Sequence, residues 1–70
     1  MAKKMKYFDN GNIQELYNYK HGKKNGKCVE YYPDGDKRVH GYFKNGKPCG
    51  VWMTWEKDGS YDWLDMDLSY

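Results

Sequence analysis

Tyr31-Tyr32-Pro33-Asp34-Gly35-Asp36 decides the fold of this 70-residue chain, because the pattern recurs at a fixed distance on either side. Tyr7-Phe8-Asp9-Asn10-Gly11-Asn12 stands 24 residues earlier, and Trp55-Glu56-Lys57-Asp58-Gly59-Ser60 stands 24 residues later. Seven of the eight glycines keep this period, and only Gly41 stands outside it. The copies cover residues 7–30 and 31–54, with a partial copy over 55–70, in a single domain 1–70. Repeats of this kind stack into an extended binding surface rather than a catalytic cleft.

The turn of each copy predicts a β-hairpin. In Pro33-Asp34-Gly35, proline fixes φ and glycine permits a left-handed backbone, which is the signature of a three-residue loop with a G1 bulge. The fold class is therefore all-β, a single open and twisted antiparallel meander of about six strands. We expect strands near residues 3–8, 12–19, 26–32, 36–43, 50–56 and 60–67. The loops between copies, 20–25 and 44–49, are longer and basic, and the residues leave their geometry open.

The three-residue loop also predicts which residues oppose each other. The expected pairs are Tyr31–Lys37, Glu30–Arg38, Val29–Val39, Trp55–Tyr61, Met53–Trp63 and Tyr7–Ile13. Such pairs join apolar with apolar side chains and opposite charges with each other, as cross-strand contacts favour. They predict one buried face, formed by Tyr7, Ile13, Val29, Tyr31, Val39, Val51, Met53, Trp55, Tyr61 and Trp63. If the basic loops were three-residue loops too, Ile13, Val29, Val39 and Val51 would form one continuous row.

The opposite face is predicted to change character along the strands. Near the Asp-Gly turns it is polar, with Gln14, Glu30, Arg38, Thr54, Glu56 and Asp62. Towards the other end it carries an apolar band of Leu16, Cys28, Tyr42, Trp52, Leu64, Met66 and Leu68. A sizeable exposed apolar band marks an interface. Three explanations stay open: the sheet coils and covers the band, the chain forms a homodimer through it, or the band binds a partner.

Charge runs from basic to acidic along the chain. Residues 1–27 carry seven Lys against Asp9 and Glu15, a net +5, whereas residues 55–70 carry a net −4. This polarity fits solvated surface, recognition of a charged partner by one end, or head-to-tail association of copies. The cysteines Cys28 and Cys49 lack metal-ligand spacing, so we expect free thiols and no metal or cofactor. Without a secretory pattern near the first residues, we expect a cytoplasmic protein.

Catalysis has little support in the residues. Neither serine stands in a nucleophile context, and the expected register places His40 opposite Cys28 with no group to orient the pair. Asp65 and Asp67 lack a third ligand type for a cation. Lysines interleave with aromatics, as nucleic-acid binding needs, but the acidic last third argues against it. Tyr and Trp hairpins also suggest a saccharide or choline site, without the sequence patterns of cell-wall-binding repeats.

The repeated motif resembles that of a known family. Tyr-x-x-x-Gly followed by Gly-Lys-x-x-Gly, as in residues 31–35 and 46–50, is similar to the MORN repeat. The chain is similar to small bacterial or phage antitoxin-like MORN variants, over roughly residues 7–60. It implies an open half-pipe sheet used for protein–protein contact, and lipid binding has been proposed for eukaryotic relatives. Glu15 and Leu16, and Lys27 and Cys28, depart from the pattern. The acidic, aromatic residues 63–70 then have two possible roles: a cap that closes the stack of repeats, or the element that recognises a partner.

We therefore expect a non-enzymatic module that docks on another protein and neutralises or scaffolds it, as an antitoxin-like or phage-type inhibitor does. Apolar anchors ringed by charge concentrate interface energy. The anchors expected here are Tyr42, Trp52, Leu64 and Met66, with the acidic steering groups Asp62, Asp65 and Asp67. The alternative is binding to an anionic phospholipid surface, through the loop lysines Lys20, Lys23, Lys24, Lys27, Lys44 and Lys47.

Overall fold

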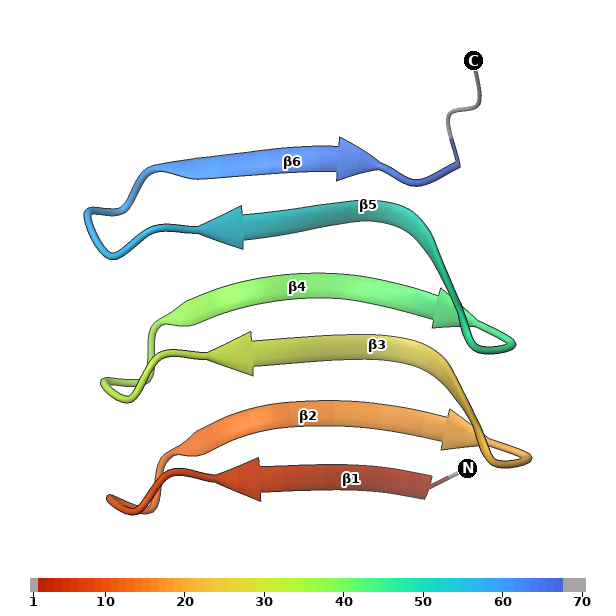
Figure 1. Ribbon diagram of the computed structural model, residues 1–70, viewed down its shortest axis with the longest axis horizontal. Coiled ribbons are helices and arrows are strands. Elements are labelled where there is room, and N and C mark those ends of the chain that lie inside the picture. The colour runs from red at the N-terminus through yellow and green to blue at the C-terminus, as the bar shows by residue number, and fades with distance from the viewer. Residues whose placement is uncertain (1, 68–70) are drawn as a thin grey trace.

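The protein forms one six-stranded antiparallel sheet in a computed structural model that describes residues 2–67 (Figure 1). The strands are β1 (Ala2–Tyr7), β2 (Ile13–Lys20), β3 (Lys23–Tyr31), β4 (Lys37–Lys44), β5 (Lys47–Trp55) and β6 (Tyr61–Asp65). They lie side by side in chain order, β1-β2-β3-β4-β5-β6. The predicted all-β meander is confirmed. Within residues 2–67, no helix has the length and apolar character that crossing a membrane requires.

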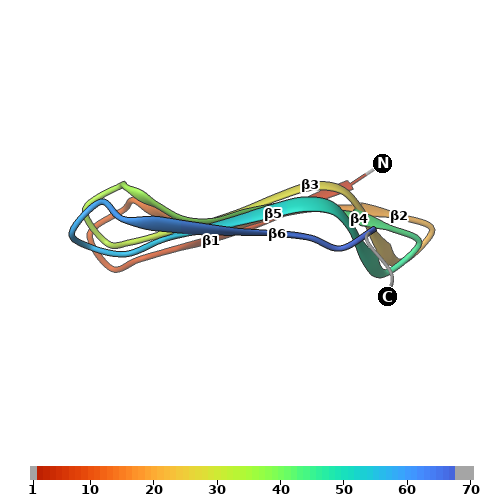
Figure 2. The same ribbon diagram turned by 90° about the horizontal axis from the view of Figure 1, so that it is seen from above.

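The sheet is a single layer, as Figure 2 shows edge-on. The Cα atoms span 37 × 30 × 10 Å. Two hydrophobic side chains in the described chain are fully buried, Cys28 at 2% exposure and Val29 at 3%. Because neighbouring residues of a strand point to opposite faces, each face has one buried residue at its centre on β3.

The three Asp-Gly turns have the predicted geometry. In the second, the Tyr32 N–H donates to the Asp36 carbonyl at 2.8 Å and the Gly35 N–H donates to the Tyr32 carbonyl at 2.9 Å. The first and third turns repeat both hydrogen bonds. Gly35 has a φ of +97°, in the left-handed region where only glycine is unstrained. The Asp34 carboxylate also accepts the Asp36 N–H at 3.0 Å, which fixes the turn from within.

The loops between repeats are shorter than their sequences suggest. Lys20 pairs with Lys23 around His21-Gly22, and Lys44 pairs with Lys47 around Asn45-Gly46. Both central residues of each loop have positive φ, as a two-residue type I′ hairpin turn requires. The strands expected to start at 26 and 50 therefore begin at Lys23 and Lys47. The extra residues are absorbed where the pairing register shifts beside Gly26 and Gly50, whose φ values are also positive.

The expected register holds next to the Asp-Gly turns and fails one step further in two hairpins. Tyr7–Ile13, Tyr31–Lys37, Trp55–Tyr61 and Met53–Trp63 are paired as predicted. Beyond Tyr31, however, β4 bulges at Arg38, so that Glu30 opposes Val39 and Val29 opposes His40. The predicted Glu30–Arg38 and Val29–Val39 pairs are wrong for that reason. β2 has an equivalent bulge at Gln14, whereas the β5–β6 pairing has none.

The bulges rearrange the two faces. We name them after their buried central residues. The Val29 face carries the row Met5–Leu16–Val29–His40–Met53–Trp63, in which each residue opposes the next. The Cys28 face carries the row Lys6–Glu15–Glu30–Val39–Thr54–Asp62. The row of Ile13, Val29, Val39 and Val51, expected only if the loops between repeats had three residues, does not form, and those loops have two residues.

The prediction of one buried face is corrected in two ways. Val39 lies on the Cys28 face, and Leu16 and Tyr42 lie on the Val29 face, because each bulge turns over the residues beyond it. The Val29 face is also not covered by the described chain. Trp63 is 63% exposed, and Tyr7, Tyr42, Val51 and Tyr61 are exposed as well. Leu68, expected in the apolar band, lies outside the described residues.

Candidate binding surface

Trp52 sits against the one glycine that departs from the repeat. A Cβ atom added at Gly41 would overlap the Trp52 indole ring. The indole N–H donates to the Cys49 carbonyl at 3.2 Å. The Phe43 ring meets the indole edge-on, with 5.1 Å between centroids and 89° between ring planes. Three contacts therefore hold a half-buried Trp on the Cys28 face in one orientation.

A shallow hollow of about 190 Å³ opens beside this tryptophan. It is lined by Trp52, Thr54, Asp62, Trp63, Leu64 and Met66. Leu64 is 59% exposed and Met66 is 39% exposed. The hollow thus brings together four of the seven residues predicted for partner binding, with apolar walls and one carboxylate.

The other three predicted residues lie elsewhere. Tyr42 opposes Lys27 and Cys49 on the Val29 face, where its ring meets His40 edge-on with 5.4 Å between centroids. Asp65 opposes Val51 on the same face. Asp67 follows β6 in a turn, where its N–H donates to the Asp65 carboxylate at 2.9 Å. These acidic groups flank the end of β6 and do not surround the hollow.

A polar cluster on the Cys28 face is built around Tyr17 and Cys28, the residues 24 positions before Gly41 and Trp52. Tyr17 opposes Cys28, and its hydroxyl donates to the Glu30 carboxylate at 2.9 Å. Arg38 makes an ion pair with the same carboxylate. Burial, followed by the hydrogen bond to Glu30, raises the pKa of Tyr17 well above its usual value. The hydrogen bond and the ion pair link β2, β3 and β4 on the Cys28 face.

The loop lysines fall into two groups. Lys20, Lys23, Lys44 and Lys47 flank the two short loops at one end of the sheet and are exposed. The Lys24 ammonium instead lies over the Tyr17 ring, 4.3 Å from its centroid, and within 5.2 Å of the Phe43 centroid. Lys27 opposes Tyr42 on the Val29 face. Four of the six predicted anion-binding lysines therefore share one end, and the other two are held apart from them.

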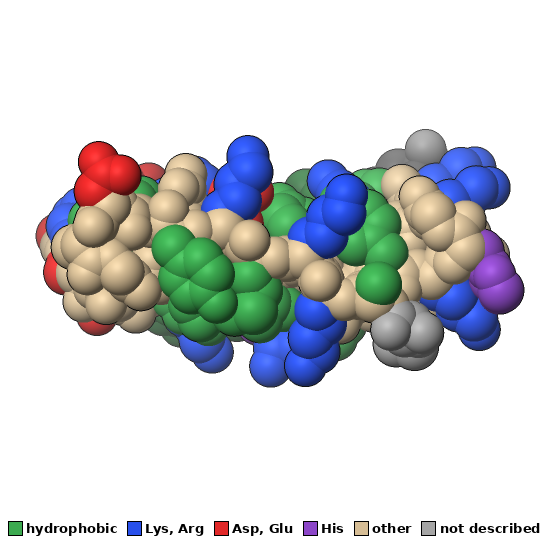
Figure 3. Space-filling view, turned by 90° about the horizontal axis from the view of Figure 1, so that it is seen from below, with side chains coloured by type: hydrophobic (Ala, Val, Ile, Leu, Met, Phe, Trp, Pro, Cys, Tyr) green, Lys and Arg blue, Asp and Glu red, His purple; other side chains and the backbone are tan. Residues whose placement is uncertain are grey.

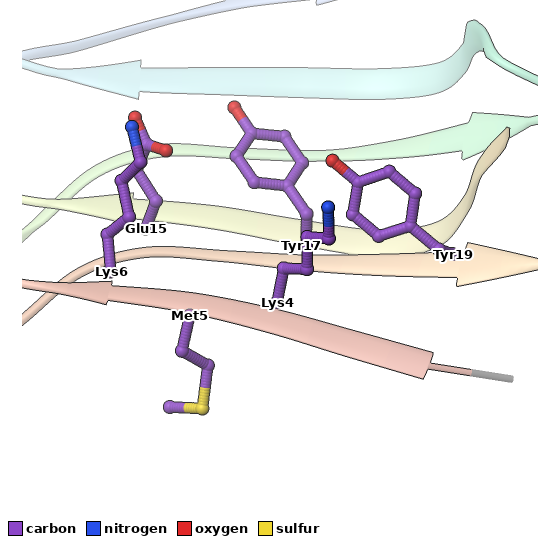
Figure 4. A pocket seen from close by; sticks show the side chains of 6 residues that line it. All are labelled: Lys4, Met5, Lys6, Glu15, Tyr17 and Tyr19. Atoms are coloured by element: carbon purple, nitrogen blue, oxygen red, sulfur yellow. The ribbon is translucent and has the colours of Figure 1, made fainter. Parts of the chain in front are cut away.

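A second hollow, of about 400 Å³, lies over β1 and β2. In Figure 4 the side chains of Lys4, Lys6, Glu15, Tyr17 and Tyr19 stand on one side of these strands, and Met5 points to the other. The Lys4 ammonium is 5.2 Å from the Tyr19 ring centroid. This hollow is the basic counterpart of the acidic, apolar hollow at the far edge.

The predicted pairing of Cys28 with His40 is wrong. Cys28 opposes Gly41, and His40 lies on the other face opposite Val29. Burial raises the pKa of the Cys28 thiol to about 11, which keeps it protonated and unreactive near neutral pH. In the described part of the chain, no group of three or more His, Cys, Asp or Glu side chains gathers as metal ligands.

Comparison with known proteins assigns the repeat. The family model described as MORN repeat matches residues 18–37 and 40–51. These residues form MORN repeats. MORN repeats are a binding type of repeat, in general for proteins or membrane lipids. A search of curated proteins and a search of solved structures each returned no match.

Proposed function

We propose that this MORN-repeat protein docks on another protein chain through the β5–β6 end of the Cys28 face. The observation that carries the proposal is the orientation of Trp52, which Gly41, Phe43 and Cys49 hold beside two exposed apolar side chains, Leu64 and Met66. An aromatic anchor that is already ordered loses little conformational entropy on binding. Aromatic anchors are also enriched among the residues that dominate interface energies.

Charge supports a partner with a basic surface. Asp62 lines the hollow, whereas Asp65 and Asp67 lie beyond it at the end of β6. Carboxylates at the rim of an apolar site accelerate encounter with basic partners more than they strengthen the complex. The proposed role is to scaffold or neutralise the partner, as antitoxin-like inhibitors do. Both cysteines are free thiols, which supports a reducing compartment such as the cytoplasm as the place of action.

Leu64→Ser tests the proposal better than a change at Trp52, because Trp52 also packs against Phe43 inside the sheet. We expect tagged wild-type protein to retain a partner from its native cells and the Leu64→Ser variant to lose it. The matched control is Val51→Ser, which alters an exposed apolar residue of the Val29 face and should keep the partner. Equal loss in both variants, or in neither, would contradict the proposed site.

One observation favours a second candidate function, binding to anionic lipid. Lys20 opposes Lys23 and Lys44 opposes Lys47, so four exposed ammonium groups lie at one end of the sheet. Juxtaposed lysines attract anionic headgroups, and salt screens that attraction. Flotation with phosphatidylserine vesicles tests this candidate. Salt-sensitive binding that Lys23→Glu and Lys47→Glu abolish, and that Leu64→Ser leaves unchanged, would favour lipid over protein.

A further inference from the structure

The exposed apolar side chains gather on the two outer strands. Within residues 2–67, β1 and β6 each have a neighbouring strand on one side only. Met5 and Tyr7 are exposed on β1, and Tyr61, Trp63 and Leu64 are exposed on β6. An open strand edge offers unpaired N–H and C=O groups to any strand that can align with it. Both edges are therefore sites where a further strand can add to the sheet.

The rows across the sheet fix the register that an added strand would take. Because β6 lacks the bulge of β2 and β4, Asp62 takes the place in its row that Glu15 and Val39 have in the earlier repeats, one residue before the 24-residue period would place it. Glu15 opposes Glu30 where β2 meets β3, and 24 residues later Val39 opposes Thr54 where β4 meets β5. The same row begins at Lys6 on β1 and ends at Asp62 on β6. The central row of the Val29 face begins at Met5 and ends at Trp63. If a second copy follows as the next repeat, its Lys6 extends the row that ends at Asp62, and its Met5 extends the row that ends at Trp63.

We infer that β6 of one copy pairs with β1 of a second copy, and that the chain associates head to tail. In the register of the internal junctions, Asp62 opposes Lys6 of the second copy and Trp63 opposes its Met5. Leu64, at the wall of the hollow, opposes Lys4. This inference rests on the proposed function, because it names a second copy of the chain as a partner for the same surface.

The side chains across this junction are complementary on both faces. Asp62 and Lys6 carry opposite charges, and directly opposed ions of opposite sign stabilise a strand pair. Met5 and Trp63 are both exposed apolar side chains, and sulfur–aromatic contacts are favourable. One step towards the Asp-Gly turns, Tyr61 would lie beside Tyr7 of the second copy. The junction would thus cover the most exposed aromatic side chains of the described chain.

Charge also makes the association directional. β1 contains Lys3, Lys4 and Lys6, and β6 contains Asp62 and Asp65. Figure 3 views the sheet from the β1 side and shows lysine side chains alternating with hydrophobic surface along this edge. Lysines on an edge strand deter pairing with a like edge, so two β1 edges repel each other and so do two β6 edges. The heterotypic β6–β1 pair is the combination without that repulsion.

The shape of the sheet predicts an open assembly. The Cα atoms extend only 10 Å along the shortest axis, so the layer is too flat for β1 and β6 of one copy to meet. A heterologous junction that does not close a ring continues from copy to copy. We expect ribbons whose average length grows with protein concentration and falls with ionic strength, because salt screens the Asp62–Lys6 attraction.

Charge exchange tests the register. Sedimentation velocity should show a wild-type mass that rises with concentration. Asp62→Lys and Lys6→Asp should each weaken self-association about tenfold or more, since each places like charges opposite each other. The double variant, or a mixture of the two single variants, should restore association. Glu56→Lys makes the same change of charge at an exposed position on the turn after β5 and should leave association unchanged.

A contact between Met5 and Trp63 provides a second measurement that needs no substitution. In one copy these residues lie on opposite edges, five strand spacings or about 24 Å apart. In a mixture of differently labelled copies, a nuclear Overhauser effect between the Met5 methyl group and the Trp63 ring therefore arises only between molecules. Its appearance supports the inference, and its absence at concentrations where the chain self-associates overturns it.

Two other outcomes would overturn the inference. One is a single monomeric species at every concentration up to the millimolar range. The other is association that the exchanged double variant fails to restore. In either case, loss of a cellular partner from Leu64→Ser but not from Val51→Ser would still uphold the proposed function, so the two failures are distinguishable.

Discussion

The first and second repeats fill the same place in the sheet in opposite ways. In the first repeat, a large residue on β2, Tyr17, opposes a small one on β3, Cys28. The residues 24 positions later are reversed in size, with Gly41 on β4 and Trp52 on β5, whose indole covers the glycine. The two solutions also differ chemically, because Tyr17 makes a hydrogen bond to Glu30 whereas Trp52 packs on Phe43.

In both repeats a large aromatic side chain on one strand lies beside a small residue on the neighbouring strand, but the two positions exchange their roles. A single-layer sheet has little depth in which to bury side chains, so the two faces are filled by a few large aromatics lying over small neighbours. The exchange also has a functional consequence. It moves the aromatic ring from the polar centre of the sheet towards β6, where it lines the hollow.

Gly41→Val should destabilise the second repeat and have the largest effect on the stability of the fold. The new side chain would occupy the space of the Trp52 ring, and overpacking of this kind costs about 3 kcal/mol. For a chain of this size that lowers Tm by more than about 10 °C. Thermal unfolding followed by circular dichroism measures it, and a Tm within about 2 °C of wild type would contradict the close contact.

The pair of the first repeat can be rebuilt in the second repeat. Gly41→Tyr combined with Trp52→Cys recreates the arrangement of Tyr17 and Cys28. We expect the loss in free energy of unfolding in the double variant to be about 1–2 kcal/mol smaller than the sum of the losses in the two single variants, a coupling typical of residues in contact. Strictly additive free energies of unfolding would show that the residues at positions 41 and 52 do not compensate each other in size.

Tyr17→Phe isolates the polar part of the first-repeat solution. It removes the hydrogen bond to Glu30 and keeps the ring beneath the Lys24 ammonium. The expected loss in the free energy of unfolding is about 1 kcal/mol. Tyr19→Phe is the matched control, because the Lys4–Tyr19 contact is made by the ring, which phenylalanine retains. Equal losses in both variants would argue against a specific role for the Tyr17 hydroxyl.

A pH dependence of stability is expected from Cys28. Its pKa is raised from 9.0 to about 11, first by burial and then by the Glu30 charge. The unfolded thiol therefore ionises first as pH rises, and ionisation favours the unfolded state. The Cys28 contribution to the free energy of unfolding should therefore be constant below pH 9 and fall between about pH 9 and 11. Cys28→Ala should flatten this fall in denaturant titrations, and Cys49→Ser should leave it unchanged.

Local turn chemistry made much of the fold predictable from the sequence. The repeated Asp-Gly pattern predicted the hairpins, the strand order and the pairs next to each turn, such as Tyr31–Lys37 and Trp55–Tyr61. The bulges at Gln14 and Arg38 were not predicted, since nothing in the residues beside those turns demands an extra position. One such residue turns over every side chain beyond it, which is why Val39 and Leu16 were placed on the wrong faces.

The candidate site was predicted in part for the same reason. Trp52 and Leu64 were placed together correctly because the β5–β6 pairing has no bulge. Tyr42 was placed with them wrongly, because it lies beyond the bulge at Arg38. The role of Gly41 was missed, although one signal for it was present: it is the only glycine outside the 24-residue period and the only one with an ordinary φ. Such a glycine indicates a close approach rather than a turn.

The proton spectrum of Gly41 tests whether the Trp52 ring covers this glycine. If the Trp52 ring covers it, both Hα protons should be shifted strongly upfield by the ring current and should show nuclear Overhauser effects to the indole protons. Val29 should then show cross-strand contacts to His40 and not to Val39. Unshifted Gly41 protons together with contacts between the Val29 and Val39 side chains would mean that the faces are assigned wrongly and that the proposed surface does not exist.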